Sequence, residues 1–269
     1  MSDLPPDERL AGRWTELRAA GRTALVAYVT AGHPAPEETA AFLRGAAEAG
    51  VDVVELGVPF SDPVADGPVI QASSHAALDA GMTARGALRL LEQAPAPVPV
   101  VLFSYLNPVL ALGPDRFARD ARRAGGAGIL ITDLPVGADD GIERALGAGG
   151  LPLVRLVAPT TPPERQRRVA ERSRGFLYLV SRLGVTGESP DVSRGLGPLV
   201  AALRTMTALP IAVGFGISTA QQAAAVGALA DGVVIGSAVV ARMERGGAAA
   251  ALAWLRTVRA ALDAAPRRA

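Results

Sequence analysis

The sequence has no lysine and no cysteine among its 269 residues, so each of its 27 basic residues is an arginine. Without a lysine amine no Schiff base can form on the chain, which excludes amine-dependent carbonyl chemistry and a lysine-anchored pyridoxal phosphate. Without a thiol, disulfides, thiolate nucleophiles and cysteine-based zinc sites are excluded as well. Any chemistry of this chain must therefore use other groups, mainly carboxylates, tyrosines, hydroxyls and backbone amides.

Three further absences narrow the class of protein. His33 and His75 are the only histidines, which is too few for a histidine-rich cluster, and we expect no metal site. The net charge is only +1, without the basic stripe that nucleic-acid binders carry. No apolar run reaches the roughly 18 to 20 residues that span a membrane, and the polar residues 1–14 lack the apolar core of a signal peptide. We therefore expect a soluble cytoplasmic protein that binds neither nucleic acid nor a membrane.

Short apolar runs rich in β-branched residues recur along the whole chain. Their near-continuous apolarity, without strict alternation, is typical of parallel strands that are covered on both faces. Alanine- and arginine-rich segments of helical length separate them, and several end in glycine, a signal for a helix C-terminus. Eight such βα units favour an α/β fold of the (β/α)8 TIM-barrel type over an open sheet. The expected strands lie at 23–30, 51–57, 98–105, 126–133, 151–159, 175–181, 209–216 and 231–238.

Two additions to the basic barrel are expected. An extra N-terminal helix should precede the first strand, over residues 5–21. The link between the second and third strands is long enough for a loop at 58–67 and two additional short helices, near 68–80 and 83–93. Because no break in composition marks a second domain, we expect residues 1–269 to form a single TIM-barrel domain.

A phosphate site is expected where the seventh and eighth strands end. The strands run into "GFGIST" and "IGSAVV", and barrels of this type often bind phosphate at these two loops, beside a helix N-terminus. Glycine lets backbone N–H groups approach an anion closely. The alternative is a pair of tight turns with Ser218 as a helix N-cap. The candidate donors belong to Gly216, Ser218, Gly236 and Ser237.

The sixth strand is followed by a long polar segment, "SRLGVTGESPDVSRG" at residues 181–195. A loop of that length in an otherwise compact barrel favours a mobile lid over the active site. An ordinary surface loop is the alternative, and the segment alone does not distinguish the two.

A carboxyl group stands inside the second apolar run. Glu55 lies near the end of 51–57, where a TIM barrel places its catalytic groups, and Asp66 follows eleven residues later in the next loop. Two carboxyls in different environments can divide the roles of acid and base. The alternatives are a structural ion pair between Glu55 and an arginine, and turn formation by Asp62 and Asp66. Together with a phosphate site, the pair predicts proton-transfer chemistry on a small phosphorylated compound, either an isomerisation or a carbon–carbon cleavage.

Seven segments of the chain resemble one family. They are "YVTAGHP", "ELGVPFSDPVADGPVIQ", "YLNP", "TDLP", "YLVSRLGVTG", "GFGIS" and "IGSA", and they stand in the order of the tryptophan synthase alpha-subunit family. The resemblance covers nearly the whole chain, and its most specific part is the long second segment. It implies a carbon–carbon lyase of L-tryptophan biosynthesis, which cleaves indole-3-glycerol phosphate to indole and glyceraldehyde 3-phosphate by a retro-aldol reaction.

The resemblance also implies roles for individual residues. Glu55 matches the catalytic acid–base glutamate of the family, Asp66 the second carboxylate, which binds the indole N–H, and Tyr178 an active-site tyrosine. The remaining matches fall into three groups. They are the phosphate contacts Gly187, Gly216, Gly236 and Ser237, the indole-pocket residues Tyr105, Leu130 and Phe215, and the lid residues Arg182 and Thr186.

A partner protein is implied by the same resemblance. The family pairs with a beta subunit that carries pyridoxal phosphate and receives indole through a tunnel, in an α2β2 heterotetramer, so we expect no cofactor in this chain itself. Asp62, Asn107 and Pro108 are the expected contact residues. Two alternatives stay open: a free-standing indole-3-glycerol phosphate lyase with the same catalytic residues, and a phosphosugar isomerase barrel. A barrel kept only to activate its partner is disfavoured because both carboxylates are present.

Overall fold

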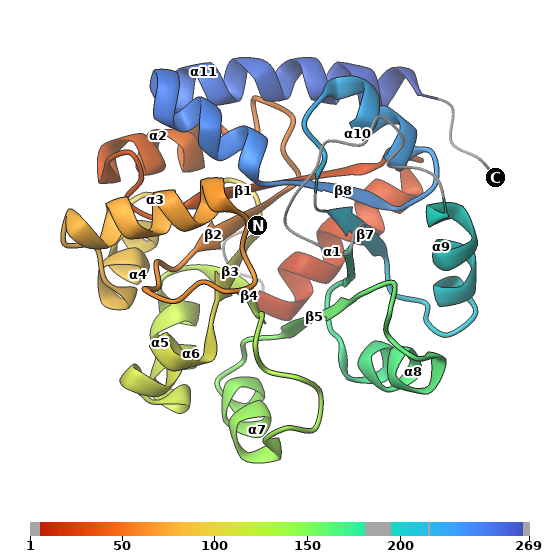
Figure 1. Ribbon diagram of the computed structural model, residues 1–269, viewed down its shortest axis with the longest axis horizontal. Coiled ribbons are helices and arrows are strands. Elements are labelled where there is room, and N and C mark those ends of the chain that lie inside the picture. Colours follow the sequence, from red (N-terminus) through yellow and green to blue (C-terminus); the bar gives the residue numbers. More distant parts are fainter. Residues whose placement is uncertain (1–5, 181–194, 215, 266–269) are drawn as a thin grey trace.

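The computed structural model describes residues 6–180, 195–214 and 216–265 of the chain. In this part of the chain eight parallel strands close into a barrel in sequence order, with the last strand paired to the first (Figure 1). Each strand falls within one of the eight apolar runs, so the expected TIM barrel is confirmed. The strands are β1 (Ala24–Thr30), β2 (Val53–Gly57), β3 (Val100–Ser104), β4 (Gly126–Ile131), β5 (Leu153–Val157), β6 (Leu177–Val180), β7 (Ile211–Gly214) and β8 (Gly232–Ile235).

Helices follow the strands and form the outer ring of the barrel (Figure 1). The expected N-terminal helix is α1 (Pro6–Ala19), and the two expected helices between β2 and β3 are α3 (Pro68–Asp79) and α4 (Ala84–Gln93). Several helices begin with proline in the first turn, where its missing N–H has no helical partner to lose. The others are α2 (Pro36–Gly45), α5 (Leu106–Leu112), α6 (Pro114–Arg123), α7 (Asp140–Ala148), α8 (Pro163–Arg172), α9 (Leu196–Arg204), α10 (Ala220–Gly227) and α11 (Ser237–Ala264).

Both faces of the strands are buried, which explains their near-continuous apolarity. One set of side chains, including Val26, Val101 and Leu130, packs inside the barrel. The intervening residues, such as Leu25 and Leu102, pack between the sheet and the helices. None of the helices in the described ranges is long and apolar enough to cross a membrane.

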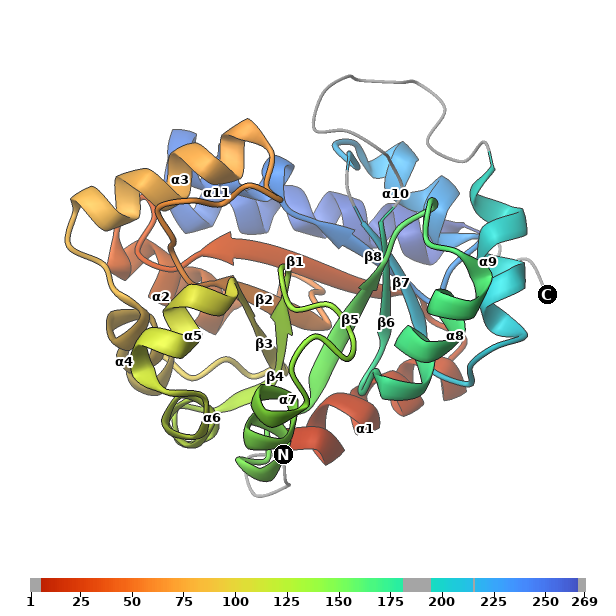
Figure 2. The same cartoon turned by 60° about the horizontal axis from the view of Figure 1, so that its bottom comes forward.

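Helix α1 closes the end of the barrel at which the strands begin (Figure 2). The ring of Trp14 packs against Phe176 with 5.2 Å between ring centroids. Gly232 leaves room for it, because a Cβ atom there would lie 2.6 Å from the Trp14 ring. Leu10 fills the same end and is completely buried. The open end, where a substrate can enter, is therefore the one at which the strands finish.

A buried carboxylate ties α1 to the barrel. Asp52 accepts hydrogen bonds from the backbone N–H of Leu25 at 2.8 Å and from the guanidinium groups of Arg13 and Arg259. Arg259 belongs to α11, the last helix, and also donates to the carbonyl of Thr23 at 2.9 Å. One carboxylate thus links the first helix, the first two strands and the last helix at the closed end.

We expect Trp14→Ala to destabilise the protein by about 3–5 kcal/mol, because the substitution leaves a cavity in the plug of the barrel. Trp254→Ala is the matched control, since Trp254 is only partly buried on α11, beneath Arg242. Trp254→Ala should lower the free energy of unfolding by clearly less than Trp14→Ala does. Urea unfolding of both variants measures the difference. Equal losses of stability would show that the packing of Trp14 does not make α1 the element that closes this end of the barrel.

Candidate functional site

Two carboxyl groups meet at the open end of the barrel. Glu55 lies on β2 beside Tyr28 of β1 and Val101 of β3, so its side chain faces the barrel interior, and it is 1% exposed. Its Oε1 atom has no hydrogen-bond partner, and no arginine of the described ranges pairs with it. The structural ion pair considered from the sequence is therefore absent among these residues. Asp66, in the loop between β2 and α3, is 4% exposed.

The two carboxyls differ in acidity. Burial, together with the smaller effect of the nearby Asp66, raises the pKa of Glu55 from its ordinary value of 4.5 to about 8. Burial also raises the pKa of Asp66, to about 6, but a hydrogen bond from Tyr105 works against this shift. Near neutral pH, Glu55 is consequently the protonated member of the pair and Asp66 the ionised one. This arrangement lets one group act as an acid while the other stabilises positive charge.

Tyr105 holds Asp66 in place. Its hydroxyl donates to Oδ2 of Asp66 at 3.1 Å and accepts the backbone N–H of Ala65 at 2.9 Å, while its ring packs against Phe60. The backbone of Asp66 also forms a turn, with its N–H donating to the carbonyl of Pro63. The turn considered from the sequence is therefore present, and the carboxyl is held beside the barrel mouth in addition. Tyr105, which the resemblance placed in an indole pocket, directly contacts this carboxyl.

Two tyrosine side chains pack against glycines that end the next strand: Tyr28 of β1 against Gly57 of β2, and Tyr178 of β6 against Gly214 of β7. A Cβ atom added at Gly57 would overlap the hydroxyl of Tyr28, and one added at Gly214 would overlap that of Tyr178. Burial raises the pKa of both tyrosines, and the carboxyls of Glu55 and Asp66 add to the effect, so both phenols stay protonated. Tyr178 is among the site residues predicted from the sequence, whereas Tyr28 is not. The signal for Tyr28 is a tyrosine inside the first apolar run, whose other residues are apolar or threonine.

The proposed phosphate donors lie at the loops after β7 and β8. Gly216 has a φ of 80°, in the left-handed region that favours glycine, and it is exposed. Gly236 precedes α11, whose first residue, Ser237, is exposed, so the free N–H groups of that helix end are accessible. Gly236 is also next to the tyrosine side of the site, because a Cβ atom there would lie 3.6 Å from the Cβ atom of Tyr28.

Ser218 does not take the role that the sequence suggested. Its backbone N–H and its hydroxyl both donate to Oε1 of Gln222, at 2.8 and 3.1 Å. The N-cap of α10 is Thr219, which forms a capping box with the same Gln222. The alternative considered from the sequence, a cap at Ser218, is thus wrong by one residue, because Thr219 rather than Ser218 lies three residues before the glutamine. The donors of Ser218 are already used within the loop.

Of the remaining predicted site features, Leu130 lies in the described part of the chain, whereas the lid and four individual residues do not. Leu130 is completely buried inside the barrel, in one cluster with Phe103 and Tyr178, which is compatible with a wall of an apolar pocket. The lid at 181–195, except its last residue, lies outside the described residues. The same is true of four of the individual predictions, Arg182, Thr186, Gly187 and Phe215.

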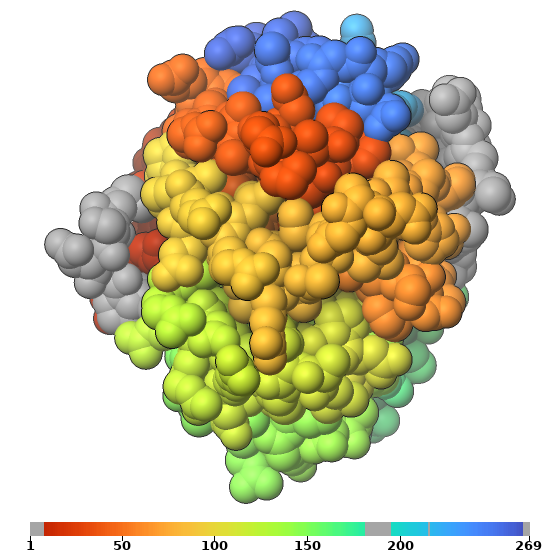
Figure 3. All heavy atoms as spheres, turned by 90° about the vertical axis from the view of Figure 1, so that its left-hand side faces the viewer, coloured from red at the N-terminus to blue at the C-terminus, as the bar shows by residue number. Residues whose placement is uncertain are grey.

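The expected partner surface is exposed and partly apolar. Asp62 and Asn107 are exposed and Pro108 is partly exposed. Val64 in the same loop and Leu110 on α5 are among the large apolar side chains that remain exposed in the described ranges, at 80% and 45%. Tyr105 joins the two segments, since it binds Ala65 and immediately precedes α5. Figure 3 shows this side of the molecule, where the orange and yellow parts of the chain form a continuous surface.

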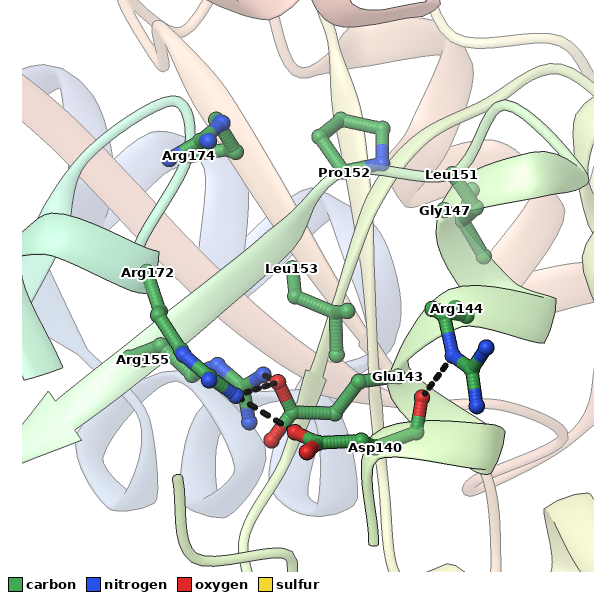
Figure 4. Close-up of a pocket in the computed structure, with 10 residues that line it drawn as sticks. All are labelled: Asp140, Glu143, Arg144, Gly147, Leu151, Pro152, Leu153, Arg155, Arg172 and Arg174. Atoms are coloured by element: carbon green, nitrogen blue, oxygen red, sulfur yellow. Dashed lines mark hydrogen bonds and ion pairs between the residues drawn. The ribbon is translucent and has the colours of Figure 1, made fainter. Parts of the chain in front are cut away.

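A second hollow lies on the outside of the barrel and does not have the features of a reaction site (Figure 4). It encloses about 490 Å³ and is lined by residues of α7, β5 and α8. Its carboxylates are paired, Glu143 with Arg155 at 2.8 Å and Asp140 with Arg172 at 2.6 Å. Acid–base chemistry needs a carboxyl free to exchange a proton, so the barrel mouth is the stronger candidate. The described residues contain no group of three or more histidines and carboxylates placed to hold a metal.

Comparisons with known proteins agree with this fold and site. The sequence profile of the tryptophan synthase alpha chain family matches residues 14–263. The alpha chain of Laribacter hongkongensis is 47% identical over 96% of this chain and 98% of its own length, and that of Geobacter sulfurreducens is 47% identical over 88% and 90%. Among solved structures, tryptophan synthase subunit alpha of Legionella pneumophila superposes with a TM-score of 0.86, at 34% identity over 95% of this chain and 98% of that one. Tryptophan synthase of Mycobacterium tuberculosis gives 0.85, at 34% identity over 94% and 98%.

The fold and the site define a TIM barrel with a buried carboxyl group of raised pKa at the mouth of the barrel. Within that class, the chain belongs to the tryptophan synthase alpha chain family. This confirms the resemblance, the lyase class and the role as the alpha subunit in tryptophan biosynthesis. The phosphosugar isomerase alternative is thereby disfavoured, and the alpha chain is by its name part of an enzyme with a further subunit.

We expect Glu55→Gln to stabilise the fold increasingly as the pH rises. The pKa of Glu55 is higher in the folded state, so unfolding releases its proton between pH 4.5 and about 8. The parent protein therefore loses stability relative to the variant through this window, by up to a few kcal/mol, and below it the difference no longer changes with pH. Urea unfolding at several pH values measures this, with Glu48→Gln at an exposed position as the matched control. A pH-independent difference would contradict the buried, protonated carboxyl.

Proposed function

We propose that this chain cleaves indole-3-glycerol phosphate by a retro-aldol reaction, with Glu55 as the group that moves the proton. The observation that carries the proposal is a buried carboxyl, without an ion-pair partner among the residues that the structure describes, whose pKa is raised to about 8. Such a group is protonated at neutral pH, and its pKa is close enough to that pH for the group to give up and regain a proton.

The proton transfers follow from that state. Glu55 donates its proton to C3 of the indole ring, which leaves a cationic ring and an ionised Glu55. The carboxylate then takes the proton of the glycerol hydroxyl on the carbon attached to C3. As that hydroxyl becomes a carbonyl, the carbon–carbon bond breaks and its electron pair returns to the ring, which releases indole and glyceraldehyde 3-phosphate. Glu55 ends the cycle protonated.

Asp66 stabilises the intermediate in this proposal. The positive charge of the protonated ring is shared by the indole nitrogen, and an ionised carboxylate beside the N–H lowers its free energy. The hydrogen bond from Tyr105 supports this role, because it orients the carboxyl and favours its ionised form. Tyr178, also at the mouth, would contact the substrate between the two carboxyls, and Leu130 would form part of the wall of the indole pocket.

The phosphate group would bind at the end of β8. Backbone amides at Gly236 and Ser237, at the start of α11, donate to no backbone carbonyl of the described residues and would be free for an anion, and Gly216 lies in the preceding loop. Gly236 is next to Tyr28, which itself pairs with Glu55 across the two strands. The phosphate at β8 and the reacting carbon at β2 would therefore lie on the two sides of β1. Gly187, Phe215, Arg182 and Thr186 stay predictions for the phosphate site, the pocket and the lid.

We also propose that a beta subunit covers the face formed by Asp62, Val64, Asn107, Pro108 and Leu110, in an α2β2 assembly. The support is an exposed apolar surface on two segments that Tyr105 holds beside the active carboxyls. Docking there can change the reaction through Asp66. Pyridoxal phosphate would belong to the partner, since this chain has no lysine to anchor it.

We expect Glu55→Gln to lower the rate of cleavage of indole-3-glycerol phosphate by at least ~10². The amide keeps the size of the side chain but cannot carry the proton. Glu48→Gln, the same substitution at an exposed position, should retain parental activity. The assay is release of indole by the purified protein, and a Glu55→Gln variant with more than about a tenth of parental activity would remove Glu55 from the mechanism.

For the partner surface, we expect Leu110→Asp to weaken binding of a tryptophan synthase beta subunit by ~10-fold or more, since the charge must be buried without a partner. Ala249→Asp, at an exposed position of α11 on another side of the barrel, is the control. Calorimetry gives the affinities and indole release gives the stimulation. A parent chain that is fully active alone and binds no beta subunit would instead be a free-standing lyase.

A further inference from the structure

Three buried hydroxyls form a chain that ends inside the active site. Ser73 of α3 and Thr30 of β1 have their oxygens 2.7 Å apart, and the hydroxyl of Thr30 donates to that of Tyr28 at 3.4 Å. Each of the three residues is 5% exposed or less. With Thr30 as the donor, the proton of the Tyr28 hydroxyl has no acceptor among the hydrogen bonds of the described residues. It is available for another group.

The position of Tyr28 points to the acceptor. Tyr28 and Glu55 are direct neighbours across β1 and β2, and both face the barrel interior. The Tyr28 side chain leans over Gly57, two residues beyond Glu55 on the same strand, where any larger residue would displace it. The phenol ring is fixed from another side by Phe103, at 5.3 Å in an edge-on contact. The hydroxyl is thereby held near the two carboxyls, and both Asp66 and Glu55 interact with it electrostatically.

We propose that Tyr28 is a positioning residue that donates its hydroxyl hydrogen to the carboxylate of Glu55 when that group ionises. The inference rests on the proposed function, in which Glu55 alternates between its acid and its ionised form. It adds a second polar residue to the proton-transfer step, supported by Thr30 and Ser73 behind it.

The physical need for such a donor comes from the reaction itself. Once Glu55 has given its proton to the substrate, two ionised carboxylates share a buried space, and each raises the energy of the other. A neutral hydroxyl beside them can relieve part of this cost, because a hydrogen bond to a charged group is stronger than one between neutral groups. The titratable groups facing this space in the described ranges are Glu55, Asp66, Tyr28, Tyr105 and Tyr178.

Tyr28 is the member of this set suited to the task. The proton of Tyr105 is already donated to Asp66, so Tyr105 stabilises the other carboxylate. Thr30 can donate to Tyr28 while Ser73 donates to Thr30, and this order of donors polarises the Tyr28 hydroxyl toward the carboxyls. Only the contact between Thr30 and Ser73 can take either direction, and when Thr30 donates to Ser73, Ser73 donates to the carbonyl of Ile70, at 2.8 Å.

The test is Tyr28→Phe, which removes one oxygen and keeps the ring. The alkaline limb of the kcat/KM profile for indole-3-glycerol phosphate, which reports the loss of the Glu55 proton, should move upward by about one pH unit. The value of kcat should fall ~10-fold with little change in KM, because the hydrogen bond forms only when Glu55 ionises. Thr30→Val should shift the limb in the same direction by a smaller amount.

Thr23→Val is the matched control for Thr30→Val. Thr23 is a buried threonine just before β1, at the opposite end of the strand, where its hydroxyl donates to the carbonyl of Gly227. Its removal should leave the pH profile unchanged. A ¹³C titration of the glutamate carboxyls, with Glu55 assigned by its absence in Glu55→Gln, gives the same shift without turnover.

The outcomes distinguish a failure of the proposed function from a failure of the role of Tyr28. If Glu55→Gln retains activity, the proposed function fails. If Glu55→Gln is inactive but Tyr28→Phe has the parental pH profile and the parental Glu55 titration, only the role of Tyr28 fails. An equal shift in Tyr28→Phe and Thr23→Val would likewise overturn it, because the effect would then come from a general loss of packing.

Discussion

The mouth of this barrel depends on keeping one carboxyl group, that of Glu55, out of water without an ion-pair partner among the described residues. Desolvation disfavours its charged form, so the group holds its proton to a pH of about 8. Strand register makes this possible, because Glu55 lies between Tyr28 and Val101 in the interior rather than at the surface. The free energy that the closed barrel gains elsewhere offsets the cost of burying a group that ionises readily in water. An acid that works at neutral pH thus arises from a position in a strand.

The space around this carboxyl is shaped by side-chain size. The pair Tyr28 and Gly57, on β1 and β2, recurs as Tyr178 and Gly214, on β6 and β7. In each pair the glycine ends a strand, and the tyrosine of the preceding strand occupies the space that a side chain would fill. From the sequence, Gly57 and Gly214 resemble ordinary glycines of turns. Their φ angles, however, are not in the left-handed region. Their effect is to admit two neutral hydroxyls beside two carboxyls without widening the barrel.

The sequence predicts more of the fold than of the site. All eight strands are recognisable because burial on both faces leaves continuous apolar runs, and Glu55 stands out as a carboxyl group near the end of such a run. The hydroxyl chain could not be predicted in this way, since Thr30 and Ser73 are 43 residues apart and meet only when α3 packs on β1. The misplaced cap at Ser218 has a local reason, because neighbouring serine and threonine are equally good caps until the position of Gln222 decides between them. Sequence periodicity thus identifies elements, whereas the site depends on contacts between elements.

The two ends of β2 show what decides whether a buried carboxyl is structural or reactive. Asp52, just before the strand, and Glu55, within it, are both 1% exposed, so burial does not distinguish them. Asp52 accepts a backbone N–H and two arginine guanidinium groups and holds the closed end of the barrel together. Glu55 has no such partners in the described part of the chain, and its bound proton is what avoids an uncompensated buried charge. The hydrogen bonds of Asp52 stabilise the closed end of the barrel. That stability allows Glu55, three residues later, to remain without a partner for its Oε1 atom at the open end. A proton held this way can be transferred, because no arginine of the described ranges fixes the carboxyl in its ionised form.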